Sequence, residues 1–278
     1  MGTQWYLADD HAVDNIPSGF KKLLFVGRLP GPTSGQIQSL VSQATGSTWS
    51  IANEPNRPPA YDPKEVANDL QALYTTIRQA DPTAKLLSPP VLNYLFTCTL
   101  CAGYMPGRDW LNAFREEFRV LYGSEPQFDA WALNVYPLDW ENIPTVNSQL
   151  AIDQIVGFRG YLDSVPALAG KPIWITELGL HWGWDKWATT VPGCQTPSPS
   201  GTYRGDLVAK YLTELFDWLD ANAAAMKIER VFVYVTYRDI TVCSPDAYAG
   251  MTLFNGATVG ASLTDAGKLL RERIAGGK

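Results

Sequence analysis

The chain has 278 residues, which is enough for one domain with a single large core. Its net charge is −6 and it has no basic run, so nucleic acid and anionic membrane surfaces are not expected as partners. No stretch of about 18 apolar residues occurs, which argues against a membrane-spanning helix.

Seven short apolar runs predict β-strands along the chain. They occupy residues 4–8, 23–27, 48–53, 85–88, 130–136, 173–177 and 230–236. Most of these runs are separated by sequence with a helical apolar period. The chain therefore repeats the unit of strand, helix and strand, which is typical of parallel sheets covered by helices.

The clearest predicted helix follows the third strand. Asp62 is its expected N-cap, Pro63 its first residue, and Glu65 completes a capping box. The helix is expected to stop before Asp81 and Pro82. Similar apolar stripes predict a helix through Trp110, Phe114, Phe118 and Leu121, and another through Val208, Tyr211, Leu212, Leu215 and Leu219.

This alternation fits either a closed (β/α)8 TIM barrel or an open, doubly wound sheet. No glycine-rich phosphate-binding fingerprint follows the first strand, which disfavours the open nucleotide-binding fold. We therefore expect residues 1–278 to form one α/β barrel. Two long segments after strands, residues 93–107 and 178–203, are expected to bind a ligand or cover a site.

Two glutamates stand at the ends of buried strands, where a charge is costly unless it has a function. Glu54 follows the third predicted strand and Glu177 ends the sixth. Because the carboxyl ends of parallel strands meet at one face of a barrel, both carboxylates can reach one site. Cleavage of a glycosidic bond requires such a pair, about 5 Å apart for retention of configuration and about 6.5 to 9.5 Å apart for inversion.

Two motifs around these glutamates resemble those of a known clan. Residues 49–56, Trp-Ser-Ile-Ala-Asn-Glu-Pro-Asn, and residues 172–179, Pro-Ile-Trp-Ile-Thr-Glu-Leu-Gly, resemble the strand-four and strand-seven motifs of the (β/α)8 retaining glycoside hydrolases. The resemblance implies that Glu54 is the acid/base and Glu177 the nucleophile. It also implies that Asn53 binds the 2-hydroxyl group of the sugar.

Weaker parts of the resemblance suggest further substrate-binding residues. Residues 132–137 are similar to the clan's strand-six motif, which makes Tyr136 the residue that orients the nucleophile, and Asn134 stands where the clan often has histidine. Residues 233–239 resemble the last strand, with Tyr237 as the aromatic floor of a sugar subsite. Arg28 corresponds to the clan's early arginine. Trp182, in the loop after Glu177, is a candidate sugar platform.

The number of predicted strands differs from that of the clan. Only two of them precede the strand that leads to Asn53 and Glu54, whereas an eight-stranded barrel with its acid on strand four has three before that strand. Either a further short strand lies within residues 9–22, or the N-terminal part of the barrel is abbreviated.

The four cysteines allow two interpretations. Cys194 and Cys243 lie in loops after neighbouring strands, so a disulfide between them is expected, which would suggest an oxidising compartment. The alternative is a zinc site that uses Cys98 and Cys101 with two further ligands. We expect an extracellular or periplasmic protein, although no signal peptide precedes the first strand.

The leading hypothesis is a retaining, endo-acting β-glycanase that acts on a polysaccharide or oligosaccharide as a monomer. It needs no metal or other cofactor. Ten Trp, 13 Tyr and 10 Phe residues supply flat apolar faces for sugar rings. The alternatives are a carbohydrate-binding barrel without turnover and an inverting hydrolase; the sugar and its linkage stay open.

Overall fold

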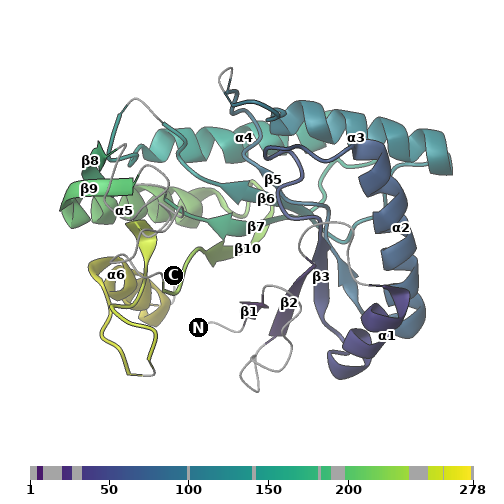
Figure 1. The fold of residues 1–278 in the computed structure, drawn as a ribbon, viewed down its shortest axis with the longest axis horizontal. Coiled ribbons are helices and arrows are strands. Elements are labelled where there is room, and N and C mark those ends of the chain that lie inside the picture. Colours follow the sequence, from purple (N-terminus) through teal and green to yellow (C-terminus); the bar gives the residue numbers. More distant parts are fainter. Residues whose placement is uncertain are drawn as a thin grey trace.

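The structure is a computed structural model, and it describes residues 5–8, 21–26, 33–98, 101–139, 142–180, 183–188, 198–237, 250–258 and 260–276. Its parallel strands lie in the middle of the molecule with helices above them and on both sides, and the labels β8 and β9 lie at one edge (Figure 1). The strands are β1 (Trp5–Ala8), β2 (Lys21–Val26), β3 (Thr48–Ile51), β4 (Lys85–Leu86), β5 (Val91–Leu92), β6 (Trp131–Val135), β7 (Ile173–Leu178), β8 (Trp184–Ala188), β9 (Ser198–Tyr203) and β10 (Ile228–Val233). The helices are α1 (Ser34–Gln43), α2 (Pro63–Ala80), α3 (Gly107–Tyr122), α4 (Ser148–Ser164), α5 (Gly205–Asn222) and α6 (Asp265–Ala275).

The parallel strands lie side by side in chain order, as a (β/α) barrel requires. One sheet has the order β1, β2, β3, β4, and a second has the order β5, β6, β7, β10. A parallel bridge between Leu87 and Ala130 joins the two sheets. Strands β4 and β5 are thus two pieces of one barrel position, separated by Pro89 and Pro90, which have no N–H group to donate to a sheet.

All seven predicted strands are present, and two of them precede β3, the strand that leads to Glu54. The proposed extra strand within residues 9–22 concerns a segment that lies mostly outside the described residues, and residues 21–22 belong to β2. None of the described helices is both long and apolar enough to cross a membrane.

The predicted helices form as expected, and their apolar stripes are buried. In α2 the Asp62 carboxylate caps the helix, but it accepts from the amide of Lys64, the residue before Glu65 of the expected capping box. The main core fills the space between sheet and helices. A smaller cluster lies on the other face of the strands and contains Leu23, Leu87, Ala130, Ala132 and Trp174.

Residues on β6 and β7 alternate between these two cores, and this alternation positions the polar side chains. Trp131, Leu133 and Val135 of β6 belong to the core beneath the helices. Ala132 faces the smaller cluster, and Asn134 follows it on the same face at the carboxyl end of the strand. The inner face therefore changes from apolar to polar toward the carboxyl ends of the strands.

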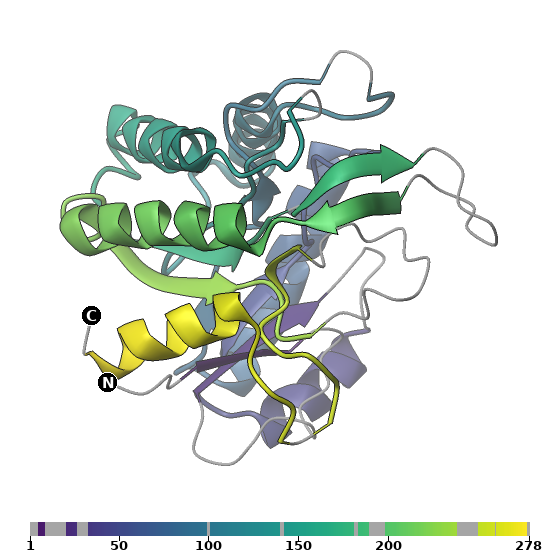
Figure 2. The same cartoon turned by 90° about the vertical axis from the view of Figure 1, so that its left-hand side faces the viewer.

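The long segment after β7 contains a hairpin that the sequence did not predict. Strands β8 and β9 pair in antiparallel fashion, and the rings of Trp184 and Tyr203 pack 5.0 Å apart. Proline and glycine within residues 198–203 disfavour a strand locally, so the cross-strand pairing overrides the local preference. The hairpin projects on the side toward which β10 points (Figure 2).

Candidate active site

Glu54 follows β3 in an unusual backbone conformation. Ala52 and Glu54 have φ angles of 64° and 47°, in the left-handed region that favours glycine. Such residues cost about 1 to 3 kcal/mol each and persist only where the surroundings enforce them. The Glu54 amide donates to the carbonyl oxygen of Pro90 at 2.9 Å, and its side chain is buried to 8% exposure. The strain thus accompanies a fixed, buried carboxylate.

Glu177 lies in β7, and its carboxylate has two partners from different strands. The hydroxyl of Tyr136 donates to Oε2 at 2.6 Å, and Nδ2 of Asn53 lies 3.4 Å from Oε1. Tyr136 follows β6 and Asn53 follows β3, so the contacts span the carboxyl ends of three strands.

A chain of amides connects the two glutamates. Nδ2 of Asn134 donates to Oδ1 of Asn53 at 3.2 Å and to Oε1 of Glu54 at 3.1 Å. Asn53 in turn donates to Glu177. The structure therefore brings Asn53, Glu54, Asn134, Tyr136 and Glu177 together, as the sequence predicted. Neutral donors face both carboxylates, which suits an acid and a nucleophile at one scissile bond.

Charges near the site act on two tyrosines. Burial raises the pKa of Tyr136 well above its usual value, and the carboxylates of Glu177 and Glu54 raise it further. Burial also raises the pKa of Tyr104, and Glu54 adds to the effect, whereas the hydrogen bond with Asn56 opposes it. Both phenols stay protonated, so Tyr136 is a neutral donor to Glu177.

Arg57 is a charged neighbour of Glu54 that the sequence analysis missed. Its Nη1 lies 3.4 Å from Oε2 of Glu54, and its amide donates to the Glu54 carbonyl oxygen. Arg57 is 43% exposed, so its attraction for the carboxylate is screened by water.

Two buried asparagines, also missed, fasten the loops beside the site. Asn56 accepts from the Leu92 amide at 2.8 Å and donates to its carbonyl oxygen at 3.0 Å. Asn93 forms the equivalent pair with the backbone of Tyr136, at 2.9 and 2.8 Å. Each side chain thus pairs with the backbone N–H and C=O groups of one residue, as a neighbouring strand would. Asn93 directly follows β5, a two-residue strand that the sequence analysis did not predict, so the rule that singled out Glu54, a polar residue directly after a buried strand, did not reach it.

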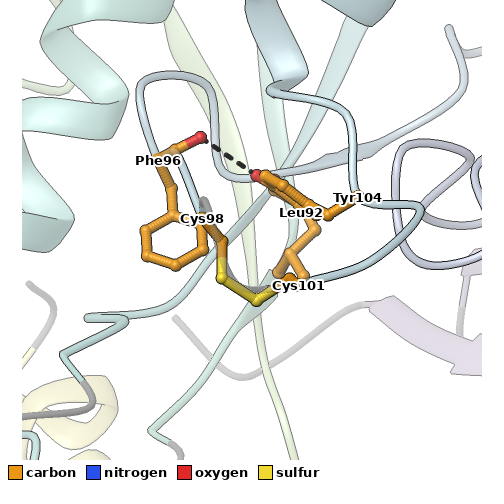
Figure 3. The surroundings of a disulfide bond; sticks show 5 residues. All are labelled: Leu92, Phe96, Cys98, Cys101 and Tyr104. Atoms are coloured by element: carbon orange, nitrogen blue, oxygen red, sulfur yellow. Dashed lines mark hydrogen bonds between the residues drawn. A yellow bond between two sulfur atoms is a disulfide. The ribbon is translucent and has the colours of Figure 1, made fainter.

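The segment after β5 carries a disulfide between Cys98 and Cys101 (Figure 3). The zinc alternative for these cysteines is therefore wrong, because their sulfur atoms are bonded to each other. Beside them Tyr104 donates to the carbonyl oxygen of Phe96 at 3.1 Å, and the two rings pack edge to face. Cys194 and Cys243 lie outside the described residues, and so do Arg28 and Trp182.

Two aromatic residues follow the last parallel strand, β10. Tyr237, the predicted sugar floor, is half-buried just beyond β10. Tyr234 packs its ring against Tyr136 at 6.4 Å and 70°, a contact that the sequence did not suggest. Within the described part of the chain, no three His, Cys, Asp or Glu residues cluster as metal ligands.

Comparison with known proteins gives one family and a set of similar structures. The sequence profile of the family described as "Glycosyl hydrolase catalytic core" matches residues 5–269. A search of curated proteins found none that matches.

Three solved structures illustrate the shared fold. A GH128 (subgroup II) endo-β-1,3-glucanase from Sorangium cellulosum matches with a TM-score of 0.61 and 15% identity, covering 96% of this chain and 88% of that one. The subgroup II endo-β-1,3-glucanase from Pseudomonas viridiflava gives 0.57 and 18%, covering 90% and 78%. The subgroup I endo-β-1,3-glucanase from Amycolatopsis mediterranei, in complex with laminaritriose, gives 0.56 and 17%, covering 97% and 90%. At these identities the likeness concerns the fold.

Proposed function

The chain belongs to the glycosyl hydrolase catalytic core family, and from this membership we propose that it is a retaining, endo-acting β-glycanase with a β-1,3-linked glucan as its substrate. The observation that carries the proposal is the amide chain from Glu54 through Asn134 and Asn53 to Glu177. The β-1,3 linkage is suggested by the printed activities of the similar structures.

In the proposed mechanism Glu177 attacks the anomeric carbon while the glycosidic C–O bond breaks. The leaving oxygen takes the proton of Glu54, and the product is a glycosyl ester of Glu177. Glu54, now a carboxylate, then removes a proton from water, and the water oxygen displaces Glu177 from the anomeric carbon. Asn53 and Tyr136 keep the Glu177 carboxylate oriented through the two reactions.

Hydrolysis of a linear β-1,3-glucan by the purified protein is the direct test. The panel should include β-1,4- and mixed-linked glucans, mannan, xylan and galactan, and proton NMR should identify the first-formed anomer. We expect a β-anomer first, and oligosaccharides of several lengths as early products. A first-formed α-anomer would indicate the inverting mechanism. Because we expect no metal in the reaction, dialysis of the protein against a chelator should leave the rate of hydrolysis unchanged.

Azide rescue can assign the two carboxylates. With an activated aryl β-glycoside, Glu54→Ala should regain turnover in azide and form a β-glycosyl azide, because azide needs no general base. Glu177→Ala should instead give an α-glycosyl azide. Glu65→Ala, at an exposed position of α2, is the matched control. Reversed products would exchange the two roles.

The rival function is a carbohydrate-binding barrel. It would be favoured if the wild-type protein hydrolysed no β-glycan and Glu54→Gln bound an oligosaccharide as well as wild type does. Asn134 and Tyr136, which face the carboxylates rather than open solvent, argue for turnover.

We also propose that the protein works as a monomer outside the cytoplasm. The Cys98–Cys101 disulfide supports an oxidising compartment, where such bonds persist. A polymeric substrate agrees with that location. Light scattering on the purified protein and mass-spectrometric mapping of its disulfides test the two statements.

A further inference from the structure

Strand β7 has one residue more than β6 beside the amide chain. Leu133 pairs with Ile175 and Asn134 with Glu177, so the register places Thr176 in a bulge. In a regular strand, Thr176 and Glu177 would point to opposite faces. Here the side chains of both residues contact the same polar network.

The Thr176 hydroxyl is a donor to Asn134. Its Oγ1 lies 2.7 Å from Oδ1 of Asn134 and 3.5 Å from the carbonyl oxygen of Leu133, and both of these atoms can only accept. The side chains of Thr176 and Asn134 are fully buried, at 0% exposure. Water from the surface therefore does not compete for the contact.

This contact orients the Asn134 amide. With Oδ1 turned toward Thr176, the N–H groups of Asn134 face Oδ1 of Asn53 and Oε1 of Glu54. The reverse orientation would place the amide oxygen against those two oxygen atoms. It would also let a protonated Glu54 donate its proton to Asn134 instead of to the leaving group.

The orientation continues to the second carboxylate. Because Oδ1 of Asn53 accepts from Asn134, Nδ2 of Asn53 faces Oε1 of Glu177 at 3.4 Å. We propose that Thr176 is a positioning residue for both carboxylates, since its hydroxyl sets the direction of the hydrogen bonds through Asn134 and Asn53. The inference rests on the proposed function, because it assigns Thr176 to the same reaction.

Thr176→Val removes the hydroxyl and keeps the shape of the side chain. We expect kcat to fall about tenfold with little change in KM, as for the loss of one buried hydrogen bond that acts on the reacting groups. Thr176→Ser should restore most of the lost kcat. Thr48→Val is the matched control, because Thr48 is a buried threonine at the start of β3, away from the carboxyl ends of the strands.

A double-mutant cycle tests whether Thr176 acts through Asn134. Asn134→Ala should itself lower kcat, and adding Thr176→Val to it should cause no further loss beyond about twofold. Losses that multiply would overturn the proposal, as would a Thr176→Val enzyme with wild-type kcat. If Thr176→Val does not fold, Thr176→Ala provides a second variant without the hydroxyl.

The side-chain amide signals in a ¹H–¹⁵N NMR spectrum give a readout that needs no activity. Asn134→Ala and Asn53→Ala identify the two signals by their disappearance. We expect both to shift in Thr176→Val, and to keep their positions in Thr48→Val. Unshifted signals in Thr176→Val would overturn the inference. If the wild-type protein hydrolyses no glycan, the proposed function fails, while this measurement still decides the geometry around Thr176.

Discussion

The phenolic oxygen of Tyr136 lies 2.6 Å from Oε2 of Glu177, and the buried hydroxyl is the donor. Burial and the carboxylates of Glu177 and Glu54 raise the pKa of Tyr136, so this donor stays neutral over the working pH range. Tyr136 thus donates a hydrogen bond to Glu177 without bringing a positive charge that would compete with the sugar for the carboxylate.

Tyr136→Phe should lower kcat/KM roughly 10- to 100-fold. The substitution removes a hydrogen bond to a charged group, worth about 1.5 to 3 kcal/mol, and keeps the ring that packs against Tyr234. Steady-state kinetics on the best glycan checks the value. Tyr122→Phe is the control, because the Tyr122 hydroxyl bonds to Asn68 on the surface. Wild-type kcat/KM in Tyr136→Phe would contradict the prediction.

Gly179→Ala should also lower activity, as expected for Tyr136→Phe, because it displaces the ring of Tyr136. An added Cβ would lie 2.1 Å from Cε1 and 2.8 Å from Cζ of Tyr136, so the ring would have to move away from Glu177. Gly160→Ala on α4 is the matched control, because nothing lies within 4 Å of its added Cβ. It should be neutral or stabilise the helix by up to about 1 kcal/mol. Equal activities in the two variants would refute the steric argument.

Asn93→Ala should lower the free energy of unfolding by about 2 to 4 kcal/mol. It leaves the amide and carbonyl groups of Tyr136 without their two side-chain partners in a buried setting. Urea unfolding measures the loss. Asn142→Ala should change stability by about 0.5 kcal/mol or less, because Asn142 is exposed and its side-chain amide donates a hydrogen bond to Asp139. A similar effect of both substitutions would argue against a stabilising role of the hydrogen bonds between Asn93 and the Tyr136 backbone.

Buried tyrosines should make the protein less stable at alkaline pH. Burial raises the pKa of Tyr211 in the folded state, whereas an unfolded tyrosine titrates near pH 10. Above about pH 10 the unfolded chain therefore releases a proton that the folded state keeps, and stability falls as the pH rises. Tyr211→Phe removes the contribution of this hydroxyl to the pH dependence. The unfolding free energy of the variant should therefore fall less steeply than that of wild type between about pH 9 and about pH 11. Parallel curves would show that Tyr211 titrates normally in the folded protein.

The barrel order and the meeting of Glu54 with Glu177 could be predicted from the sequence for one physical reason. Buried parallel strands are short apolar runs, and a carboxylate at the end of such a run is costly unless it is used. Asn53, Asn134 and Tyr136 were expected at this edge from the family resemblance and not from this reasoning. The catalytic roles of Glu54 and Glu177 stay predictions that kinetics must test.

Other features depend on geometry that a sequence pattern does not carry. The second strand of the β8–β9 hairpin consists of residues 198–203, whose proline and glycine disfavour a strand. The role of Thr176 depends on a one-residue bulge, which leaves no mark in the alternation of residues. The Cys98–Cys101 bond was missed because a Cys-x-x-Cys spacing suits metal ligation as well as a disulfide.

The hydrogen bonds of Asn56 and Asn93 also bear on which segments of the chain can vary in length and sequence. Asn56, beyond the end of β3, and Asn93, beyond the end of β5, each bind the backbone at the next strand with a single side chain. We expect that segments beyond Asn56 and Asn93 can be lengthened or exchanged while Glu54, Tyr136 and Glu177 keep their spacing. New glycan preferences are therefore accessible by exchange of whole loops, without redesign of the residues that react.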